Sequence, residues 1–282
     1  MGWCELYRVE KEGRFRVYKV LKPEFRDKEP YERLLRKEFE IGYSLSHPGI
    51  CEVYAFFRHH SFGNAIEMEW VDGINLKEAL ETERWSSEKR GRILDELLDA
   101  LQYIHSRQVV HKDLKPSNIM ITHNGDHVKI IDFGVADQDC DVTRLPGGTR
   151  SYAAPELLEG GVADQRSDIY SLGKILTLSH PSLGRIARKC LQTDPSMRYQ
   201  DVVEIKKALQ RHRSRPLVWI LVVLVAILGT LLWYRGFHTG MNHSPENVVL
   251  HPSVQVEDTV SDPAIIDELF RQATELIGAD GQ

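Results

Sequence analysis

The feature that most constrains this chain is an uncharged stretch of 18 residues toward its C-terminal end. Residues 217–234 read LVWILVVLVAILGTLLWY, and a helix of this composition is apolar on every side. At about 1.5 Å per residue such a helix is roughly 27 Å long, close to the roughly 30 Å hydrocarbon core of a bilayer. A buried core helix is the alternative. The terminal aromatic residues Trp219, Trp233 and Tyr234 and the flanking basic residues favour a single membrane span.

Basic residues are concentrated on the N-terminal side of this stretch. Arg235 follows it closely, whereas five basic residues precede it: Lys206, Lys207, Arg211, Arg213 and Arg215. Positive charge near a span marks its cytoplasmic side. The sequence therefore predicts a single-pass protein of the cell membrane, with residues 1–216 in the cytoplasm, a basic juxtamembrane segment at 213–216 and the C-terminal tail outside the cytoplasm.

The predicted tail is acidic. Residues 235–282 carry two arginines and eight carboxylates, a net charge of −6, so the remainder of a chain with net charge −5 is near +1. This balance gives no indication of nucleic-acid binding. We expect an extracytoplasmic linker at 235–261 and a short amphipathic helix within 262–282. That helix either self-associates, meets a partner, or is marginal on a disordered tail. A homodimer formed through the membrane span is a separate hypothesis.

Cysteine usage points to a reducing compartment for the longer N-terminal part. The four cysteines lie far apart and all precede residue 217. Their spacing matches neither a metal site nor a disulfide framework.

A short polar loop, HKDLKPSNIM at residues 111–120, carries one acid, one cation and one amide between apolar segments. Asp113 is suited to accept the proton of an attacking hydroxyl, Lys115 to balance charge on a moving phosphoryl group, and Asn118 to hold a metal ion. Phosphoryl transfer requires this combination of side chains.

Further motifs follow in order. The apolar strand before Asp132 ends in Asp132-Phe133-Gly134, and Gly148 to Glu156 read GTRSYAAPE. With these motifs the chain resembles the eukaryotic-type (Hanks-type) serine/threonine protein kinase family over about residues 1–212. Its layout is similar to that of bacterial single-pass transmembrane receptor-type kinases.

The resemblance implies an α+β, two-lobed protein-kinase-like fold followed by one transmembrane helix. The small β-rich lobe would cover about residues 1–71, and the helical lobe about residues 72–212. The cofactors implied are ATP and Mg²⁺, the latter held by Asn118 and Asp132. Asp113 and Lys115 would act on the hydroxyl and the phosphoryl group of protein serine or threonine substrates.

The small lobe supplies two further candidates. Residues 14–21 alternate as a strand does, and Lys19 matches the family's phosphate-pairing lysine. A helix is predicted over 30–46, and Glu38 lies on its mostly apolar stripe with Leu34, Ile41 and Leu45, whereas Glu40 is its competitor on the surface. A carboxylate facing a core requires a cation, and the resemblance makes Lys19 that cation.

The resemblance also places the adenine of the nucleotide. Met68 matches the residue at the back of the adenine site, and the backbone from Glu69 to Val71 would bind the adenine edge.

The chain departs from the family at two places. Met1 to Tyr7 matches only the end of the glycine-rich loop and the strand after it, so either translation starts upstream or the first strand and loop are missing. Lys112 stands where the family usually has arginine, and lysine cannot grip a phosphate bidentately. Control through the candidate phosphosites Thr143 and Ser151 is therefore open.

These departures leave alternative functions to weigh. One is a catalytically weak or inactive pseudokinase acting as a membrane-tethered binding module. The other is a small-molecule phosphotransferase, disfavoured by Thr149 and the Ala154-Pro155-Glu156 segment, which match a protein-substrate site.

Other matches are interpreted as structural. Glu156 with Arg198 matches a buried ion pair of the family, and Asp168 with Gly173 matches the helix that anchors the catalytic loop. Only 16 residues separate Gly173 from Cys190, where the family has a further helix, so the large lobe is predicted to be reduced.

Overall fold

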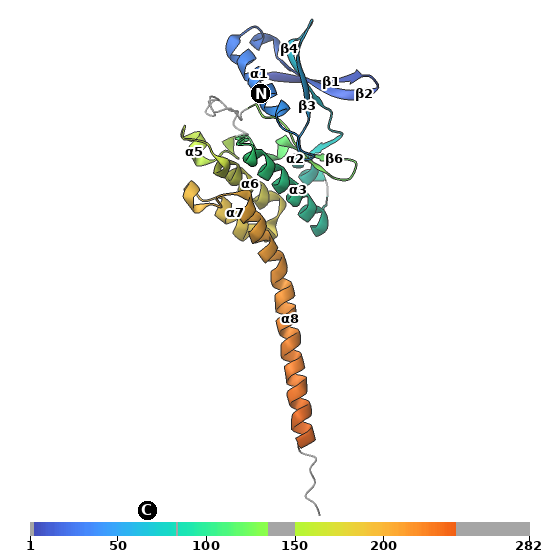
Figure 1. Ribbon diagram of the computed structural model, residues 1–282, viewed down its shortest axis with the longest axis vertical. Coiled ribbons are helices and arrows are strands. Elements are labelled where there is room, and N and C mark those ends of the chain that lie inside the picture. Colours follow the sequence, from blue (N-terminus) through green and yellow to red (C-terminus); the bar gives the residue numbers. More distant parts are fainter. Residues whose placement is uncertain (1–2, 83, 135–149, 241–282) are drawn as a thin grey trace, which may run out of the picture. The chain divides into compact units, whose positions relative to one another are not determined.

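An antiparallel sheet of four strands forms most of the small lobe in the computed structural model (Figure 1). The structure describes residues 3–82, 84–134 and 150–240, with the backbone alone described at 215–222 and 236–240. The chain divides into two compact units, residues 1–220 and 221–282.

The sheet has the order β1-β2-β4-β3. Its strands are β1 (Cys4–Lys11), β2 (Arg14–Leu21), β3 (Val53–His59) and β4 (Gly63–Glu69). The first two are joined by Glu12 and Gly13, both with positive φ, which matches the twist of a two-residue hairpin. The strand predicted over 14–21 is confirmed with these bounds.

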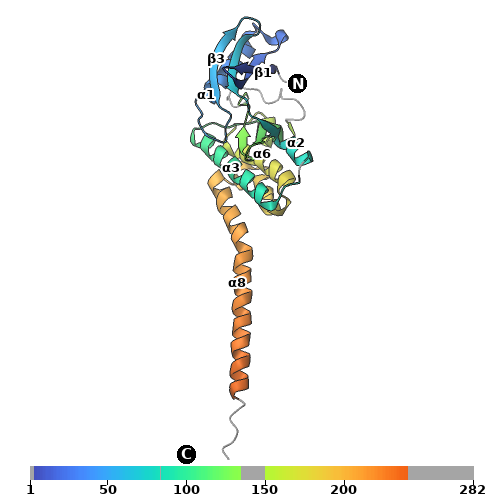
Figure 2. The same ribbon diagram turned by 90° about the vertical axis from the view of Figure 1, so that its right-hand side faces the viewer.

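One helix, α1 (Glu29–Tyr43), packs on this sheet (Figure 2). The predicted helix is confirmed, although it ends three residues earlier than expected. Its buried residues are Leu35, Glu38 and Gly42. A Cβ on Gly42 would lie 2.7 Å from a methyl group of Val53, so glycine allows the helix to approach β3 closely.

The large lobe contains a second small sheet of order β5-β6-β7 and a set of helices. The strands are β5 (Gly73–Asn75), β6 (Ile119–Thr122) and β7 (Val128–Ile130). The helices are α2 (Leu76–Thr82), α3 (Ser87–Ser106), α5 (Pro155–Leu158), α6 (Gln165–Ser179), α7 (Gly184–Cys190) and α8 (Val202–Gly240), with short 3₁₀ turns η1 (Pro23–Phe25), η2 (Pro116–Asn118), η4 (Pro181–Leu183) and η5 (Pro195–Met197).

The long helix α3 is the centre of this lobe. Ser86 caps it, because its hydroxyl accepts a hydrogen bond from Lys89 N at 3.1 Å. Seven of its residues are buried: Ile93, Leu94, Leu97, Leu98, Ala100, Leu101 and Ile104. They recur at helical spacing, so α3 presents one continuous apolar face to the main core.

The predicted reduction of the large lobe is present in the structure. The chain passes from α6 through η4 directly into α7, which begins at Gly184. The two helices pack closely, since a Cβ on Gly173 would lie 2.7 Å from the Cβ of Cys190.

The predicted pairing of Glu156 with Arg198 is also present, and it is bidentate. The two guanidinium nitrogens of Arg198 donate to the two carboxylate oxygens of Glu156 at 2.8 and 2.7 Å. Arg198 is 2% exposed, and it also donates to the carbonyls of Arg166, Gln192 and Thr193. This network fixes α5 to the turn that precedes α8.

Helix α8 has two differently exposed parts. Val202, Ile205 and Leu209 are buried in the core of the large lobe. From Val223 to Tyr234 the apolar side chains are 50–71% exposed. Within the part of the chain that the structure describes, no helix is both long enough and apolar enough to cross a membrane.

Several sequence predictions concern residues that the structure does not describe. The side chains of residues 217–222 in the predicted span lie outside the described residues, as do Thr143, Thr149 and the predicted helix within 262–282. Helix α8 continues to Gly240, six residues into the segment predicted as a linker.

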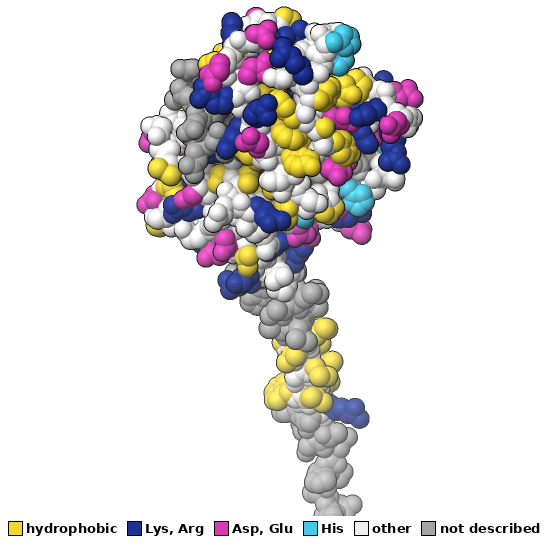
Figure 3. Space-filling view, turned by 45° about the horizontal axis from the view of Figure 1, so that its top comes forward, with side chains coloured by type: hydrophobic (Ala, Val, Ile, Leu, Met, Phe, Trp, Pro, Cys, Tyr) yellow, Lys and Arg dark blue, Asp and Glu magenta, His cyan; other side chains and the backbone are white. Residues whose placement is uncertain are grey.

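Charges of both signs are interspersed over the face of the molecule in Figure 3. Lysine and arginine side chains alternate with aspartate and glutamate around a central group of hydrophobic side chains. This face therefore offers no surface of a single sign to a nucleic-acid backbone.

Replacing Arg198 with alanine should lower the free energy of unfolding by about 3–5 kcal/mol, because it leaves the Glu156 carboxylate largely buried without its cation. Urea unfolding of the full chain measures this loss. The matched control is Arg33→Ala, which removes an exposed pair with Glu29 and should cost under about 0.5 kcal/mol. Equal losses in the two variants would contradict the structural role assigned to Arg198.

Candidate active site

Lys19 lies on β2 between two neighbouring strands and points toward two carboxylates. Its Cα partners are Leu6 on β1 and Ile66 on β4. Its Nζ donates to Glu38 Oε1 at 2.5 Å and to Asp132 Oδ1 at 2.8 Å. The predicted pairing with Glu38 is thus present, and a second contact reaches the large lobe.

The surroundings of Lys19, Glu38 and Asp132 shift the pKa of each of these side chains. Burial alone would lower the pKa of the Lys19 amine, but the carboxylates of Asp132 and Glu38 outweigh it and the pKa is raised. Burial raises the pKa of Glu38 to about 7, an effect that Lys19 opposes and Asp132 strengthens. The partial burial of Asp132 also opposes its ionisation, yet the Lys19 ammonium outweighs it and lowers the pKa of that carboxyl. Asp132 is therefore the better ionised of the two acids.

The segment after β4 is the covalent link between the two sheets. Trp70 to Asp72 connect Glu69, the last residue of β4, with Gly73, the first residue of β5. Met68 lies two residues from Ile66, which is opposite Lys19, so Met68 and Lys19 share one face of the sheet. The predicted adenine-binding positions thus follow directly from the strand that lies beside Lys19.

The catalytic-loop candidates contact one another. Lys115 Nζ donates to Asp113 Oδ2 at 2.6 Å, and Asn118 Nδ2 donates to the same oxygen at 3.1 Å and to the Asp113 carbonyl at 2.9 Å. The second carboxylate oxygen, Asp113 Oδ1, is buried and has no hydrogen-bond partner among the described residues. A buried acceptor without a partner suits a group that receives a substrate hydroxyl.

The backbone of this loop is anchored from α6. The buried carboxylate of Asp168 accepts hydrogen bonds from the backbone N–H groups of His111 and Lys112 at 2.8 and 2.9 Å. Lys112 has a φ of 62°, which is uncommon for a residue with a side chain. Asp168 therefore holds the loop in a conformation that the local sequence does not favour, as the resemblance implies.

His105 is a member of this cluster that the sequence analysis missed. Its Nε2 lies 2.9 Å from Asp168 Oδ2. The sequence does indicate a buried position for His105, because this residue is four residues after Leu101 and so falls on the buried face of α3. A polar side chain on such a face requires a partner.

Asn118 and Asp132 fit a magnesium ion. Lys19 and the N–H of Gly134 both contact Oδ1 of Asp132, and the Asp132 side chain is 42% exposed. The amide nitrogen of Asn118 binds Asp113, so its amide oxygen is the atom that would face a cation. One carboxylate and one amide suit Mg²⁺, which keeps several waters and phosphate oxygens as its other ligands. Within the described residues, no cluster of three or more His, Cys, Asp or Glu residues is arranged to hold a metal.

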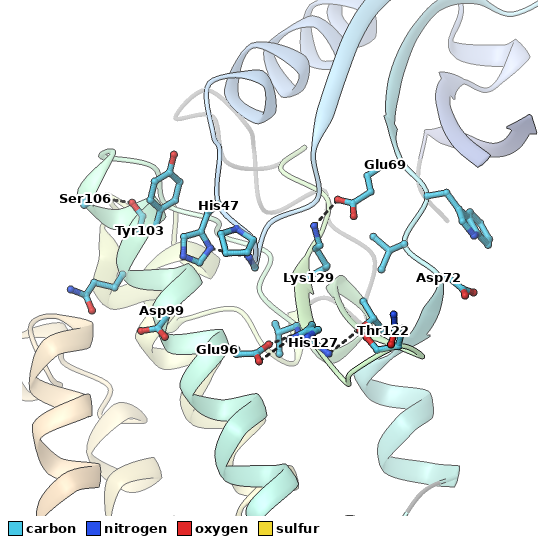
Figure 4. A pocket seen from close by; sticks show the side chains of 17 residues that line it. His47, Glu69, Asp72, Glu96, Asp99, Tyr103, Ser106, Thr122, His127 and Lys129 are labelled. Carbon is cyan, nitrogen blue, oxygen red and sulfur yellow. Dashed lines mark hydrogen bonds and ion pairs between the residues drawn. The ribbon is translucent and has the colours of Figure 1, made fainter. Parts of the chain in front are cut away.

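A cavity of about 960 Å³ lies beside the interlobe link, between α3, β7 and Glu69 to Asp72 (Figure 4). In it Lys129 Nζ donates to Glu69 Oε2 at 2.8 Å, and Glu96 accepts from Val128 N at 2.8 Å. None of the side chains that contact Lys19 or Asp113 lines it. Glu69 to Val71, the predicted adenine-binding segment, do line it, so the cavity borders the candidate active site at this segment.

Comparisons with known proteins agree with this geometry. The protein kinase domain model matches residues 1–180. The chain belongs to the protein kinase domain family. This confirms the resemblance to eukaryotic-type serine/threonine kinases and the two-lobed protein-kinase-like fold.

Curated bacterial relatives are similar over part of their length. A probable serine/threonine-protein kinase of Streptomyces coelicolor is 34% identical over 199 residues, covering 65% of this chain and 29% of that protein. The serine/threonine-protein kinase PrkC of Bacillus subtilis is 33% identical over 163 residues, covering 56% of this chain and 25% of that protein. The chain thus spans less than a third of the length of these relatives.

Solved kinase structures are similar as well. The PknI kinase domain of Mycobacterium tuberculosis superimposes with a TM-score of 0.58 at 25% identity, over 75% of this chain and 92% of that domain.

Replacing Lys19 with methionine should lower the free energy of unfolding by about 3 kcal/mol, because Glu38 and Asp132 then share a site without a cation. Glu38→Gln should cost less, since Lys19 keeps its contact with Asp132. Chemical unfolding of the full chain tests this order, with Lys22→Met as a partly exposed control expected within about 0.5 kcal/mol of the parent. A Lys19→Met variant as stable as the control would refute the arrangement.

Proposed function

We propose that this chain is a membrane-anchored serine/threonine protein kinase. It transfers the γ-phosphoryl group of ATP to serine and threonine hydroxyls of proteins in signalling. The observation that carries the proposal is the contact of Lys19 with both Glu38 and Asp132, together with the Asp113–Lys115–Asn118 cluster, which ends 14 residues before Asp132. Family membership and the bacterial serine/threonine kinase relatives support it.

Each side chain has a defined task in this reaction. Lys19, positioned by Glu38, would bind the α- and β-phosphates. Asp113 Oδ1, the oxygen without a partner among the described residues, would orient the substrate hydroxyl and receive its proton. Lys115, which lies 2.6 Å from the other Asp113 oxygen, would balance charge on the transferred phosphoryl group.

The nucleotide and its metal complete the chemistry. Mg²⁺, held by Asn118 and Asp132, neutralises phosphate charge when it is bound. Met68 and the backbone from Glu69 to Val71 would hold the adenine. The polar set is complete, which favours a working kinase over the pseudokinase alternative.

The membrane anchor rests on residues 217–234. Supporting observations are the absence of charge from this stretch, the exposed apolar side chains from Val223 to Tyr234 and the basic residues before it. An exposed apolar surface of this extent is costly in water and favourable in a bilayer. The kinase domain would then be cytoplasmic and the tail extracytoplasmic.

Homodimerisation through the membrane-embedded part belongs to the same proposal. Crosslinking of the protein in its native membrane, at native abundance, should trap a dimer. Recovery of monomer alone at saturating crosslinker would exclude it.

Mg²⁺-dependent incorporation of phosphate from labelled ATP tests the catalytic part. The full chain should label serine or threonine in a protein substrate. Asp113→Asn and Asp132→Asn should each reduce the rate at least about 100-fold, because one removes the proton acceptor and the other a metal ligand. Arg185→Glu, an exposed change on α7, is the matched control. If the full chain binds nucleotide but labels no protein, and both variants bind nucleotide equally well, the pseudokinase alternative is favoured.

The topology has its own test, made simple by the cysteine distribution. No cysteine lies between residues 191 and 282. Once the native cysteines are blocked, labelling of a cysteine introduced there shows on which side of the membrane that residue lies. In intact cells a membrane-impermeant maleimide should label Ser244→Cys but not Lys207→Cys. If both introduced cysteines were labelled only after cell lysis, the proposed membrane anchor would be contradicted. Release of the protein from membranes by alkaline washing would contradict it as well.

A further inference from the structure

A pocket of about 400 Å³ lies against the catalytic loop, on the side of Pro116. It is formed by four segments that are distant in sequence, and α2 contacts the η2 turn that begins at Pro116. The lining residues are Lys77, Leu80, Glu81, Trp85, Arg90, Pro116, Tyr152 and Leu178. Pro116 is three residues after Asp113 and so lies at most about 11 Å from it along an extended chain, which puts the pocket within reach of a protein segment that presents a hydroxyl to Asp113.

The floor of the pocket is apolar and accessible. Leu178, near the end of α6, is 57% exposed, which is unusual for a leucine beside a main core. The chain turns from Ser179 through η4 directly into α7, so no additional helix follows α6 to cover it. Tyr152, which is half-buried, adds to this apolar lining, whereas Trp85 is 8% exposed and Pro116 is buried, so these two present little surface.

The charged residues of the pocket are mainly cationic. Lys77 is exposed on α2, and Arg90 contributes a guanidinium from α3, against the single carboxylate of Glu81. Arg90 Nη1 donates to the Ser179 carbonyl at 3.3 Å, which fixes the side chain beside α6. A guanidinium has five N–H donors, so this one contact leaves capacity for a carboxylate ligand.

We propose that this pocket selects protein substrates by an apolar side chain adjacent to an acidic one near the phosphoacceptor. The apolar side chain would pack on Leu178 and Tyr152, and the acidic one would pair with Lys77 and Arg90. An extended segment at about 3.3 Å per residue covers the distance of at most about 11 Å between Asp113 and Pro116 in three to four residues, so the selected positions lie within about four residues of the acceptor. The inference rests on the proposed kinase function and specifies its substrate class.

Charge complementarity decides between substrate classes here. A basic side chain in this pocket would meet two cations and one carboxylate, and like charges placed together in an interface cost binding energy. The pocket therefore disfavours substrates with lysine or arginine at the selected positions, whereas glutamate or aspartate there is stabilised.

Positional scanning with serine and threonine peptides tests the inference on the full chain. Wild-type protein should prefer glutamate over lysine by about tenfold at one position within four residues of the acceptor, with an apolar preference at an adjacent position. Lys77→Glu and the double change Lys77→Glu/Arg90→Glu should remove or reverse the charge preference. Leu178→Asn should weaken the apolar preference alone. Arg185→Glu should leave both preferences unchanged.

The outcomes separate this inference from the proposed function. A wild-type protein that labels peptides without any acidic preference, or with a preference that survives Lys77→Glu, overturns the substrate class and leaves the kinase assignment standing. If no peptide is labelled, a measurement of peptide binding tests the inference instead. The dissociation constant of an acidic, apolar peptide with alanine at the acceptor position, measured by fluorescence anisotropy, should rise about tenfold in Lys77→Glu. An unchanged constant overturns the inference.

Discussion

One buried cation joins the two lobes of this protein. Lys19 comes from the small sheet, and its two partners come from α1 and from the segment after β7 in the large lobe. A buried ammonium is stable only with its carboxylates close by. The position of α1 and the position of Asp132 are therefore both tied to one side chain, and Lys19, the proposed phosphate-binding residue, is positioned only when the lobes are assembled.

A second buried charge performs the equivalent task in the large lobe. Asp168 on α6 accepts two backbone hydrogen bonds from the catalytic loop and contacts His105 on α3. It thereby stabilises the positive φ of Lys112, just before Asp113. The substitution of arginine by lysine at this position leaves the anchoring intact, because the anchor uses the backbone N–H groups rather than the side chain.

Much of the site could be predicted because its parts are local or periodic. Asp113, Lys115 and Asn118 lie within six residues, so one loop brings them together. Glu38 could be assigned from its place on a helical stripe. The stripe itself was rotated slightly in the prediction, since Leu35 and Gly42 are buried where Leu34 and Ile41 were expected. Spacing gives the period of a helix but not its rotation against a sheet.

The contacts that sequence reasoning missed join distant segments. The contact between Lys19 and Asp132 spans 113 residues, and the contact between His105 and Asp168 spans 63. The pocket beside Pro116 likewise combines α2, α3, α6 and Tyr152. No local pattern encodes such contacts, because they arise from how the elements pack. The membrane span stays a prediction from composition, since the side chains of residues 217–222 are outside the described residues.

The most direct test of the account compares two glutamates on the same helix. Glu38 is buried against Lys19, whereas Glu40 is exposed and lies 4.0 Å from Lys37. The measurement is kcat/KM for Mg²⁺·ATP in Glu38→Gln and Glu40→Gln variants of the full chain. The account predicts a loss of about 100-fold in the first, because the phosphate-binding lysine is no longer positioned, and a change within about twofold in the second. Equal rates in the two variants would contradict the role given to the lysine that joins the lobes.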